Sequence, residues 1–274
     1  MRIHLGHLCA KLGRRLQPWK VGSQLAIAAE QYLMGYWNEI MVEQSDNGET
    51  LILQRVNRFL GNSVITVFDV GANQGQWAVN CLRECPNACV HSFELVPATF
   101  EKLKRVLSNN SSVKLNAFGL SDISSQIDVT YYPGSDTGSS IDPLPWALES
   151  QKVSCRTVRG DDYCREQNIE IVHLLKIDVE GHEMRVLKGF DDMLAKGGIP
   201  CIQFEYGPTW LPPRFQLRDA YELLVPKGYT IGRAFPQGVK FMDYSMFRDE
   251  HFRIGNYVAV HQDYPELIKM LQKT

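Results

Sequence analysis

The sequence lacks any long apolar run and any excess of one charge. No stretch of about 18 apolar residues occurs, so we expect no membrane-spanning helix. The N-terminus also lacks the uninterrupted apolar segment of a secretory signal. The 29 basic and 31 acidic residues give a formal net charge of −2, which argues against a nucleic-acid-binding protein. With 274 residues, 44% of them hydrophobic, the chain suits one globular domain with an appended arm.

Cysteines are too scattered to predict a disulfide framework. The chain has seven of them, an odd number, so we expect reduced thiols and a cytoplasmic location. Cys81, Cys85 and Cys89 are spaced four apart, and a metal cluster is one alternative. Zinc ligands usually come in closer pairs, however, and small core residues are the favoured interpretation.

Basic residues dominate the start of the chain. Those that precede the first acidic residue, Glu30, are Arg2, Lys11, Arg14, Arg15 and Lys20. A peripheral contact with a membrane surface or an acidic partner is one interpretation. A solvated helical arm is the other, and it is favoured.

The apolar pattern changes at residue 63. Residues 1–62 have helical spacing and predict a helical N-terminal extension. In residues 63–274, β-branched runs alternate with helical segments, which predicts a doubly wound, mostly parallel α/β sheet. Ile127–Tyr132 and Val153–Val158 predict an inserted β-hairpin, and the Gly134–Asp142 loop between them is expected to be mobile.

The first predicted strand ends in a loop with two glycines, in the stretch VFDVGANQGQW. Gly71 and Gly75 allow a sharp turn and a close approach to a ligand at the carboxyl ends of the strands. The loop lacks the G-x-G-x-x-G that cradles a pyrophosphate. Asp69 would repel a phosphate and favour a cation. The loop therefore fits S-adenosylmethionine (SAM), which carries a sulfonium and an ammonium, although a plain structural turn stays open.

The next two strand tips supply further polar side chains. Glu94 ends the second strand, where an acid can accept both ribose hydroxyls of an adenosine. Gly119 permits a tight turn at the third tip, and Ser121 and Asp122 can hydrogen-bond an adenine edge. Taken alone, Ser121 and Asp122 also fit a turn or a helix N-cap.

The densest group of ionisable side chains follows the fourth strand, in LLKIDVEGHEMRVLKG. Its members are Asp178, Glu180, His182 and Glu183. Carboxylates packed together shift one another's pKa values, as functional sites often do. Glu183 is equally explained as a first-turn acid that the helix dipole favours, and His182 as a surface histidine.

These segments together resemble the FkbM family of SAM-dependent methyltransferases. The likeness rests on FDVGANQG, FELVPATFEKL, GLSD and KIDVEGHE, continues through FEYGP and GNYVAV, and covers Thr66 to Val260. Residues 1–62 lie outside it. Members of this family typically O-methylate hydroxyls of sugars, glycans or natural products. The resemblance implies a Rossmann-like class I fold with a seven-stranded sheet.

The resemblance also implies a set of site residues. Those expected to bind SAM are Asp69, Gly71, Asn73, Gly75, Glu94, Ser121, Asp122 and Asp178. Asp178 and Glu180 are expected to face the reaction centre, whereas His182 stands where the family varies. The Leu-Val-Pro that follows Glu94 departs from the family pattern, in which proline more often comes sooner after the acid.

The predicted reaction is an in-line displacement in which an acceptor hydroxyl takes the methyl group of SAM. The enzyme then has to align the partners and remove a proton. His182, or Asp178 or Glu180 with a raised pKa, can serve as the base. A divalent cation held by Asp178, Glu180 and Glu205 is the alternative, and a base without metal is favoured.

Side chains in the C-terminal half predict a site for a small-molecule or glycan acceptor. Those expected to contact it are Glu205, Tyr206, Trp210, Arg248 and His251. Two other functions stay open, a dinucleotide-linked oxidoreductase and a non-catalytic methyltransferase-like partner protein. The missing pyrophosphate loop counts against the first, and the intact set of strand-tip acids counts against the second. The sequence indicates neither the acceptor nor the oligomeric state.

Overall fold

The chain divides into two compact units, Met1–Met41 and Val42–Thr274. The computed structural model describes residues 2–17, 19–39, 44, 46–133 and 150–273. The Gly134–Asp142 loop, which the sequence analysis expected to be mobile, lies outside the described residues.

The smaller unit contains two helices, α1 (Arg2–Leu16) and α2 (Lys20–Tyr36). Both match the helical spacing of the sequence. No residue of α2 is buried. Among the described residues, no helix combines the length and the apolar character needed to cross a bilayer.

The helix α3 (Glu49–Leu60) belongs to the larger unit, whereas the sequence analysis assigned it to the N-terminal extension. Its buried residues Ile52, Leu53 and Val56 join a core with α4 (Gln76–Glu84) and α11 (Pro265–Leu271). The division between the units therefore comes before α3 and not at residue 62. Burying three large apolar side chains contributes about 1.5–3 kcal/mol each, which is enough to fix the helix on the sheet.

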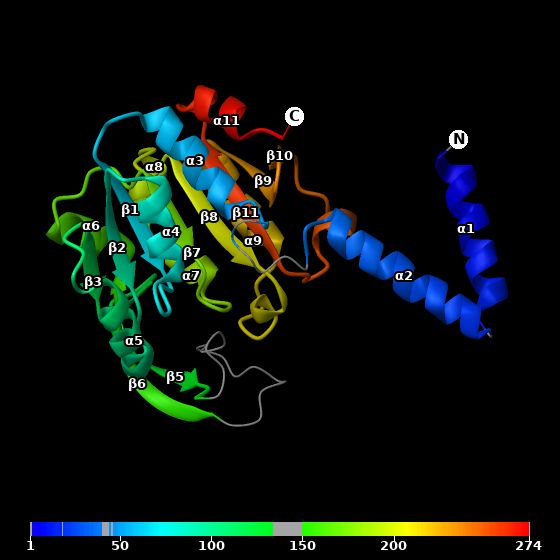
Figure 1. Ribbon diagram of the computed structural model, residues 1–274, viewed down its shortest axis with the longest axis horizontal. Helices are drawn as coiled ribbons and strands as arrows, with labels where there is room; N and C mark the ends of the chain where they lie inside the picture. The colour runs from blue at the N-terminus through cyan, green and yellow to red at the C-terminus, as the bar shows by residue number, and fades with distance from the viewer. Residues whose placement is uncertain (1, 18, 40–43, 45, 134–149, 274) are drawn as a thin grey trace. The chain divides into compact units, whose positions relative to one another are not determined.

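The larger unit is built on one eight-stranded sheet with the order β10-β9-β11-β8-β7-β1-β2-β3 (Figure 1). In that order the strands are Gly238–Phe241, Tyr229–Phe235, Gly255–His261, Cys201–Tyr206, Leu174–Ile177, Ile65–Val70, Ala88–Phe93 and Val113–Asn116. The five strands from β8 to β3 are parallel, and β11, β9 and β10 each run antiparallel to their neighbours. The predicted doubly wound sheet is confirmed. It has one strand more than predicted, because the chain turns after β9 and adds β10 to the edge.

Helices cover both faces of this sheet, as a doubly wound fold requires. One face carries α3, α4, α11 and α5 (Pro97–Leu107), and Figure 1 shows α3 and α4 in front of the strands. The other face carries α6 (Gly160–Glu166), α7 (Glu183–Gly189), α8 (Asp191–Ala195) and α9 (Leu217–Leu224). The short helices are η1 (Pro208–Trp210), η2 (Val225–Lys227) and α10 (Met246–Asp249).

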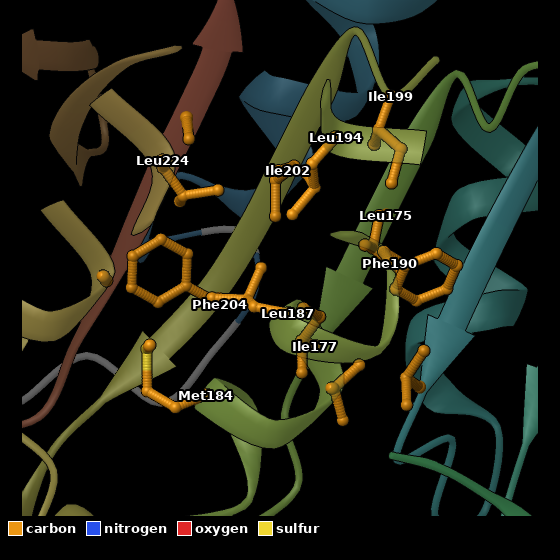
Figure 2. Close-up of a cluster of buried hydrophobic side chains, with 14 of the residues drawn as sticks. Leu175, Ile177, Met184, Leu187, Phe190, Leu194, Ile199, Ile202, Phe204 and Leu224 are labelled. Carbon is orange, nitrogen blue, oxygen red and sulfur yellow. The ribbon is translucent and has the colours of Figure 1, made fainter. Parts of the chain in front are cut away.

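The centre of the second face is an apolar core formed by strands β7 and β8 and helix α7. Figure 2 shows Leu175 and Ile177 of β7 and Phe204 of β8 near Leu187 of α7. All four residues of β7 are buried, because the strand lies inside a sheet that is covered on both faces. Lys176 is the one charged residue in this strand, and its position matters for the site.

The predicted hairpin insertion is confirmed and is part of a second, three-stranded sheet. β5 (Ser125–Tyr131) pairs antiparallel with β6 (Gln151–Arg159). β4 (Gly119–Ser121) pairs parallel with β6 on its other side. The segment that follows β3 therefore continues into this small sheet, where the sequence analysis expected a turn.

Candidate active site

The glycine loop that follows β1 is fastened to the strands on both sides of it. The backbone N–H groups of Gly71 and Ala72 donate to the carbonyl of Phe93 on β2, at 3.0 and 2.9 Å. The N–H of Asp178 donates to the carbonyl of Val70 at 3.0 Å. A Cβ atom at Gly71 would lie 1.8 Å from the carbonyl oxygen of Asp178, so only glycine fits there. The structure thus brings the first, second and fourth predicted tips together.

Glu94 lies directly after β2 and holds this loop. Its two carboxylate oxygens accept hydrogen bonds from the N–H groups of Asn73 and Val96, at 3.0 and 2.9 Å. Burial raises the pKa of Glu94 to about 7, and the two backbone donors partly oppose that rise. Each oxygen retains a second lone pair, so the carboxylate can both hold the loop and accept a ligand hydroxyl.

Asp69 is fully buried beneath the loop, and it faces Lys176 of β7. The Nζ atom of Lys176 lies 3.2 Å from Oδ1 of Asp69 and 3.5 Å from Oδ2 of Asp178, and it donates to the carbonyl of Gly71 at 3.3 Å. Burial alone would lower the pKa of Lys176, but the surrounding carboxylates outweigh burial and raise it. The charge of Asp69 is therefore matched inside the protein.

Lys176 is one residue of this site that was not predicted from the sequence, and Glu49, described below, is another. A lysine between Leu175 and Ile177 in a short buried strand was the available signal, since a buried lysine requires a partner. Its role also changes the expected role of Asp69. The sequence predicted a carboxylate that meets a cationic ligand, whereas the structure has Asp69 paired with a protein cation.

Four carboxylates gather around the end of β7, and we refer to Glu49, Asp178, Glu180 and Glu205 as the carboxylate cluster. Burial, together with the charges of Asp178 and Glu183, raises the pKa of Glu180 to about 8. Burial likewise raises the pKa of Glu205 well above its ordinary value, as do Asp178 and Glu180. Glu49, at the start of α3, also has a raised pKa because it is buried. Because these carboxylates repel one another when charged, they do not readily ionise at the same time.

The turn between β7 and α7 has two consecutive residues with positive φ, Glu180 and Gly181. Glu180 has a φ of 53° and Gly181 a φ of 100°, both in the left-handed region. Glu183 holds this turn, since its carboxylate accepts from the N–H groups of Val179 at 2.9 Å and Gly181 at 3.0 Å. A non-glycine residue in this region costs about 1–3 kcal/mol, and such strain clusters at functional sites.

His182 lies beside the third tip. Its Nε2 is 2.9 Å from Oγ of Ser121, which donates to Asp122 at 2.9 Å. Asp122 in turn pairs with Arg185 at 3.3 Å. Burial lowers the pKa of His182 to about 4, so the ring is neutral at neutral pH. An imidazole with this pKa is a weak base.

A small apolar cavity opens between the first, second and third tips. Its lining includes Val70, Gly71, Phe93, Leu95, Leu120 and His182. Its volume is about 20 Å³, which is room for one water molecule. Ser121 follows Leu120, and its hydroxyl is hydrogen-bonded to both Asp122 and His182, which forms a local network beside this cavity.

The residues predicted to contact the acceptor lie in three different places. Tyr206 and Trp210 are 0% and 1% exposed and belong to the apolar core, with the Tyr206 hydroxyl donating to Glu250 at 2.8 Å. Both are therefore placed as core residues and not at an open surface. Glu205 belongs to the carboxylate cluster. Arg248 pairs with Asp249 at 2.6 Å, and His251 accepts the N–H of Arg253 at 3.0 Å.

Within the described residues, no three His, Cys, Asp or Glu side chains are arranged to hold a metal ion. The alternative of a cation on Asp178, Glu180 and Glu205 gains no support from their arrangement. The seven cysteines are unpaired, and Cys81 and Cys85 are buried core residues.

This fold, with acidic side chains at the tips of β1, β2 and β7, defines a Rossmann-like methyltransferase. The sequence profile described as the methyltransferase FkbM domain matches residues 69–231. That match covers more than half of the chain, so the protein belongs to the FkbM methyltransferase family. The resemblance is confirmed, and membership argues against the dinucleotide-linked oxidoreductase.

Three relatives illustrate the family. Methyltransferase 1 of Beauveria bassiana is 32% identical over 145 residues, which cover 46% of this chain and 58% of that protein. Methyltransferase sdnD of Sordaria araneosa is 28% identical, over 61% of this chain and 74% of its own length. The 2-O-methyltransferase NoeI of Sinorhizobium fredii is 25% identical, over 64% and 76%. The chain thus spans little more than half of the first relative.

Proposed function

We propose that this protein transfers a methyl group from SAM to a hydroxyl of a sugar, a glycan or a glycosylated natural product. The observation that carries the proposal is the carboxylate cluster beside the glycine loop, in which Glu180 has a pKa near the pH of the cell. A group with such a pKa can be ionised and can still take up a proton from a reacting hydroxyl.

The residues at the first two tips fit SAM. The apolar side chains around the small cavity suit an adenine ring, and the carboxylate of Glu94 suits the ribose hydroxyls. Asp178 is 42% exposed at its side chain and can meet the cationic end of the ligand. In this proposal Asp69 acts indirectly, by holding Lys176 under the glycine loop.

SAM supplies, when bound, a methyl group on a sulfonium leaving group. The protein then has two tasks, to align the hydroxyl with that methyl and to accept the hydroxyl proton. We assign the second task to Glu180. His182 is a weaker base, because its pKa is lowered to about 4. Burial and the charges of the neighbouring carboxylates raise the pKa of Glu205 well above its ordinary value, which disfavours its ionised form.

Two observations support this acceptor class, namely the names of several relatives and one surface of the chain. Relatives include a 2-O-methyltransferase, a 31-O-demethyl-FK506 methyltransferase from Streptomyces tacrolimicus and a hexuronic acid methyltransferase from Haloferax volcanii. Phe247, at 97% exposure, lies next to Arg248 on α10, and His251 follows. An exposed ring beside polar side chains suits the face of a sugar. We assign Arg248 and His251 to the acceptor site.

Methyl transfer from radiolabelled SAM to a panel of glycans, nucleotide sugars and glycosylated natural products tests the proposal. We expect labelled product with at least one hydroxyl acceptor, both with and without a chelator. Glu170→Gln is the control, since Glu170 is exposed and precedes the start of β7, whereas the site lies after the end of that strand. Transfer only to nitrogen or carbon nucleophiles would contradict the proposal.

A further inference from the structure

Helix α1 presents leucines along one side and cations along another. Leu8, Leu12 and Leu16 recur every four residues, which sets them on one face of a helix. Leu8 and Leu12 are 64% and 56% exposed. At 100° per residue, Arg15, Lys11 and Arg14 lie about 60°, 100° and 160° from Leu12 in one direction around the helix, so the cations border the leucine stripe on one side.

Helix α2 has an apolar stripe of its own that is also exposed. Val21, Leu25, Tyr32 and Tyr36 fall on one side at helical spacing, and they are 58%, 55%, 70% and 55% exposed. Trp19, just before α2, is 67% exposed. Large apolar side chains gathered in this way mark an interaction surface, because a monomer rarely exposes them together.

We propose that α1 and α2 bind the surface of an anionic lipid membrane. The apolar stripes would enter the boundary between headgroups and acyl chains, and the basic side chains would meet the lipid phosphates and carboxylates. Tyrosine and tryptophan favour this depth because their rings are apolar at one end and polar at the other. Neither helix is long and apolar enough to cross the bilayer, so the contact is peripheral.

The positive charge of α1 and α2 favours a lipid surface, and not a second copy of the chain, as the binding partner. All charged side chains of the described segment up to residue 29 are cations, and Glu30 is the first acid. Two copies packed through these stripes would bring the same cations close together. An anionic membrane offsets them, at about 1 kcal/mol for each basic residue near the surface.

Co-sedimentation of the full-length protein with vesicles tests this inference. Phosphatidylcholine vesicles with ~30% phosphatidylserine should bind the protein, and pure phosphatidylcholine should bind it at least ~10-fold more weakly. Raising the salt from ~0.05 to ~0.5 M should release most of the bound protein, because exposed charges are then screened. This assay measures vesicle binding and not methyl transfer, so its result tests membrane binding independently of the proposed function.

Two variants and two matched controls separate the parts of the surface. Leu12→Glu/Leu25→Glu and Lys11→Gln/Arg14→Gln should each reduce binding at least ~10-fold. Val106→Glu and Lys104→Gln/Arg105→Gln change equally exposed residues of α5 and should bind like the unchanged protein. Equal binding to both kinds of vesicle, binding that survives in the variants, or no binding would each overturn the inference. A dimer that only Leu12→Glu/Leu25→Glu dissociates, without vesicle binding, would reassign the surface to a second copy.

Discussion

Glu180→Gln is expected to lower kcat by ~10²–10⁴-fold, the usual contribution of a positioned base. In the unchanged enzyme kcat should rise with pH through a midpoint near 8, because burial raises the pKa of Glu180 to about 8 and only the ionised carboxylate accepts a proton. That limb of the pH profile should disappear in the variant. Steady-state kinetics between pH 6 and about 9.5 measure both effects.

The structure supplies controls for this experiment. Glutamine keeps the size of the side chain, so the left-handed turn held by Glu183 should persist and SAM affinity should change little. Glu170→Gln should retain both the rate and the pH limb. His182→Gln should lower kcat less than Glu180→Gln, because the pKa of His182 is lowered to about 4. A Glu180→Gln enzyme within about twofold of the original kcat, with the same midpoint, would remove Glu180 from the chemistry.

Lys176→Met is expected to lower the free energy of unfolding by ~3–5 kcal/mol, since it leaves a buried carboxylate without its cation. Asp69 is completely buried, 3.2 Å from the lysine nitrogen. The pKa of Asp69 is already raised by burial, and Lys176 is the group that opposes that rise. Chemical denaturation of the two proteins measures the difference.

A double variant makes the Lys176 prediction specific. Asp69→Leu/Lys176→Met removes both charges and should recover at least half of the loss, because no uncompensated charge remains on Asp69. Lys114→Met, on the edge strand β3, replaces an exposed lysine and should change stability by no more than about 0.5 kcal/mol. Equal losses for Lys176→Met and Lys114→Met would contradict the ion pair.

Much of the larger unit was predictable because its strands are buried on both faces. Such strands appear as apolar runs, so β1 and β8 are visible in the sequence, and glycines and acids after them indicate ligand-binding tips. Pro97 similarly indicated the first turn of α5. Parallel strands put their carboxyl ends on one edge, and that geometry brought Asp69, Glu94 and Asp178 into one region.

The features of the fold and the site that could not be predicted from the sequence depend on contacts between distant segments. Helical spacing predicted α3, but only its packing against α11 assigns the helix to the larger unit and brings Glu49 to the cluster. Tyr206 and Trp210 look like acceptor aromatics in sequence, yet both fill the core. The partner of Lys176 is on another strand, and pairing in space is invisible in a linear pattern.

Calorimetric titration of SAM tests the central claim that the strand tips form a SAM site. We predict one site per chain in the unchanged protein, no binding of NAD, and at least a ~100-fold loss of SAM affinity in Glu94→Ala with an unchanged circular dichroism spectrum. Glu94 is decisive because its carboxylate holds the glycine loop and is the group that we propose to accept the ribose hydroxyls. SAM affinity that is the same in Glu94→Ala, or NAD binding in place of SAM, would contradict the account.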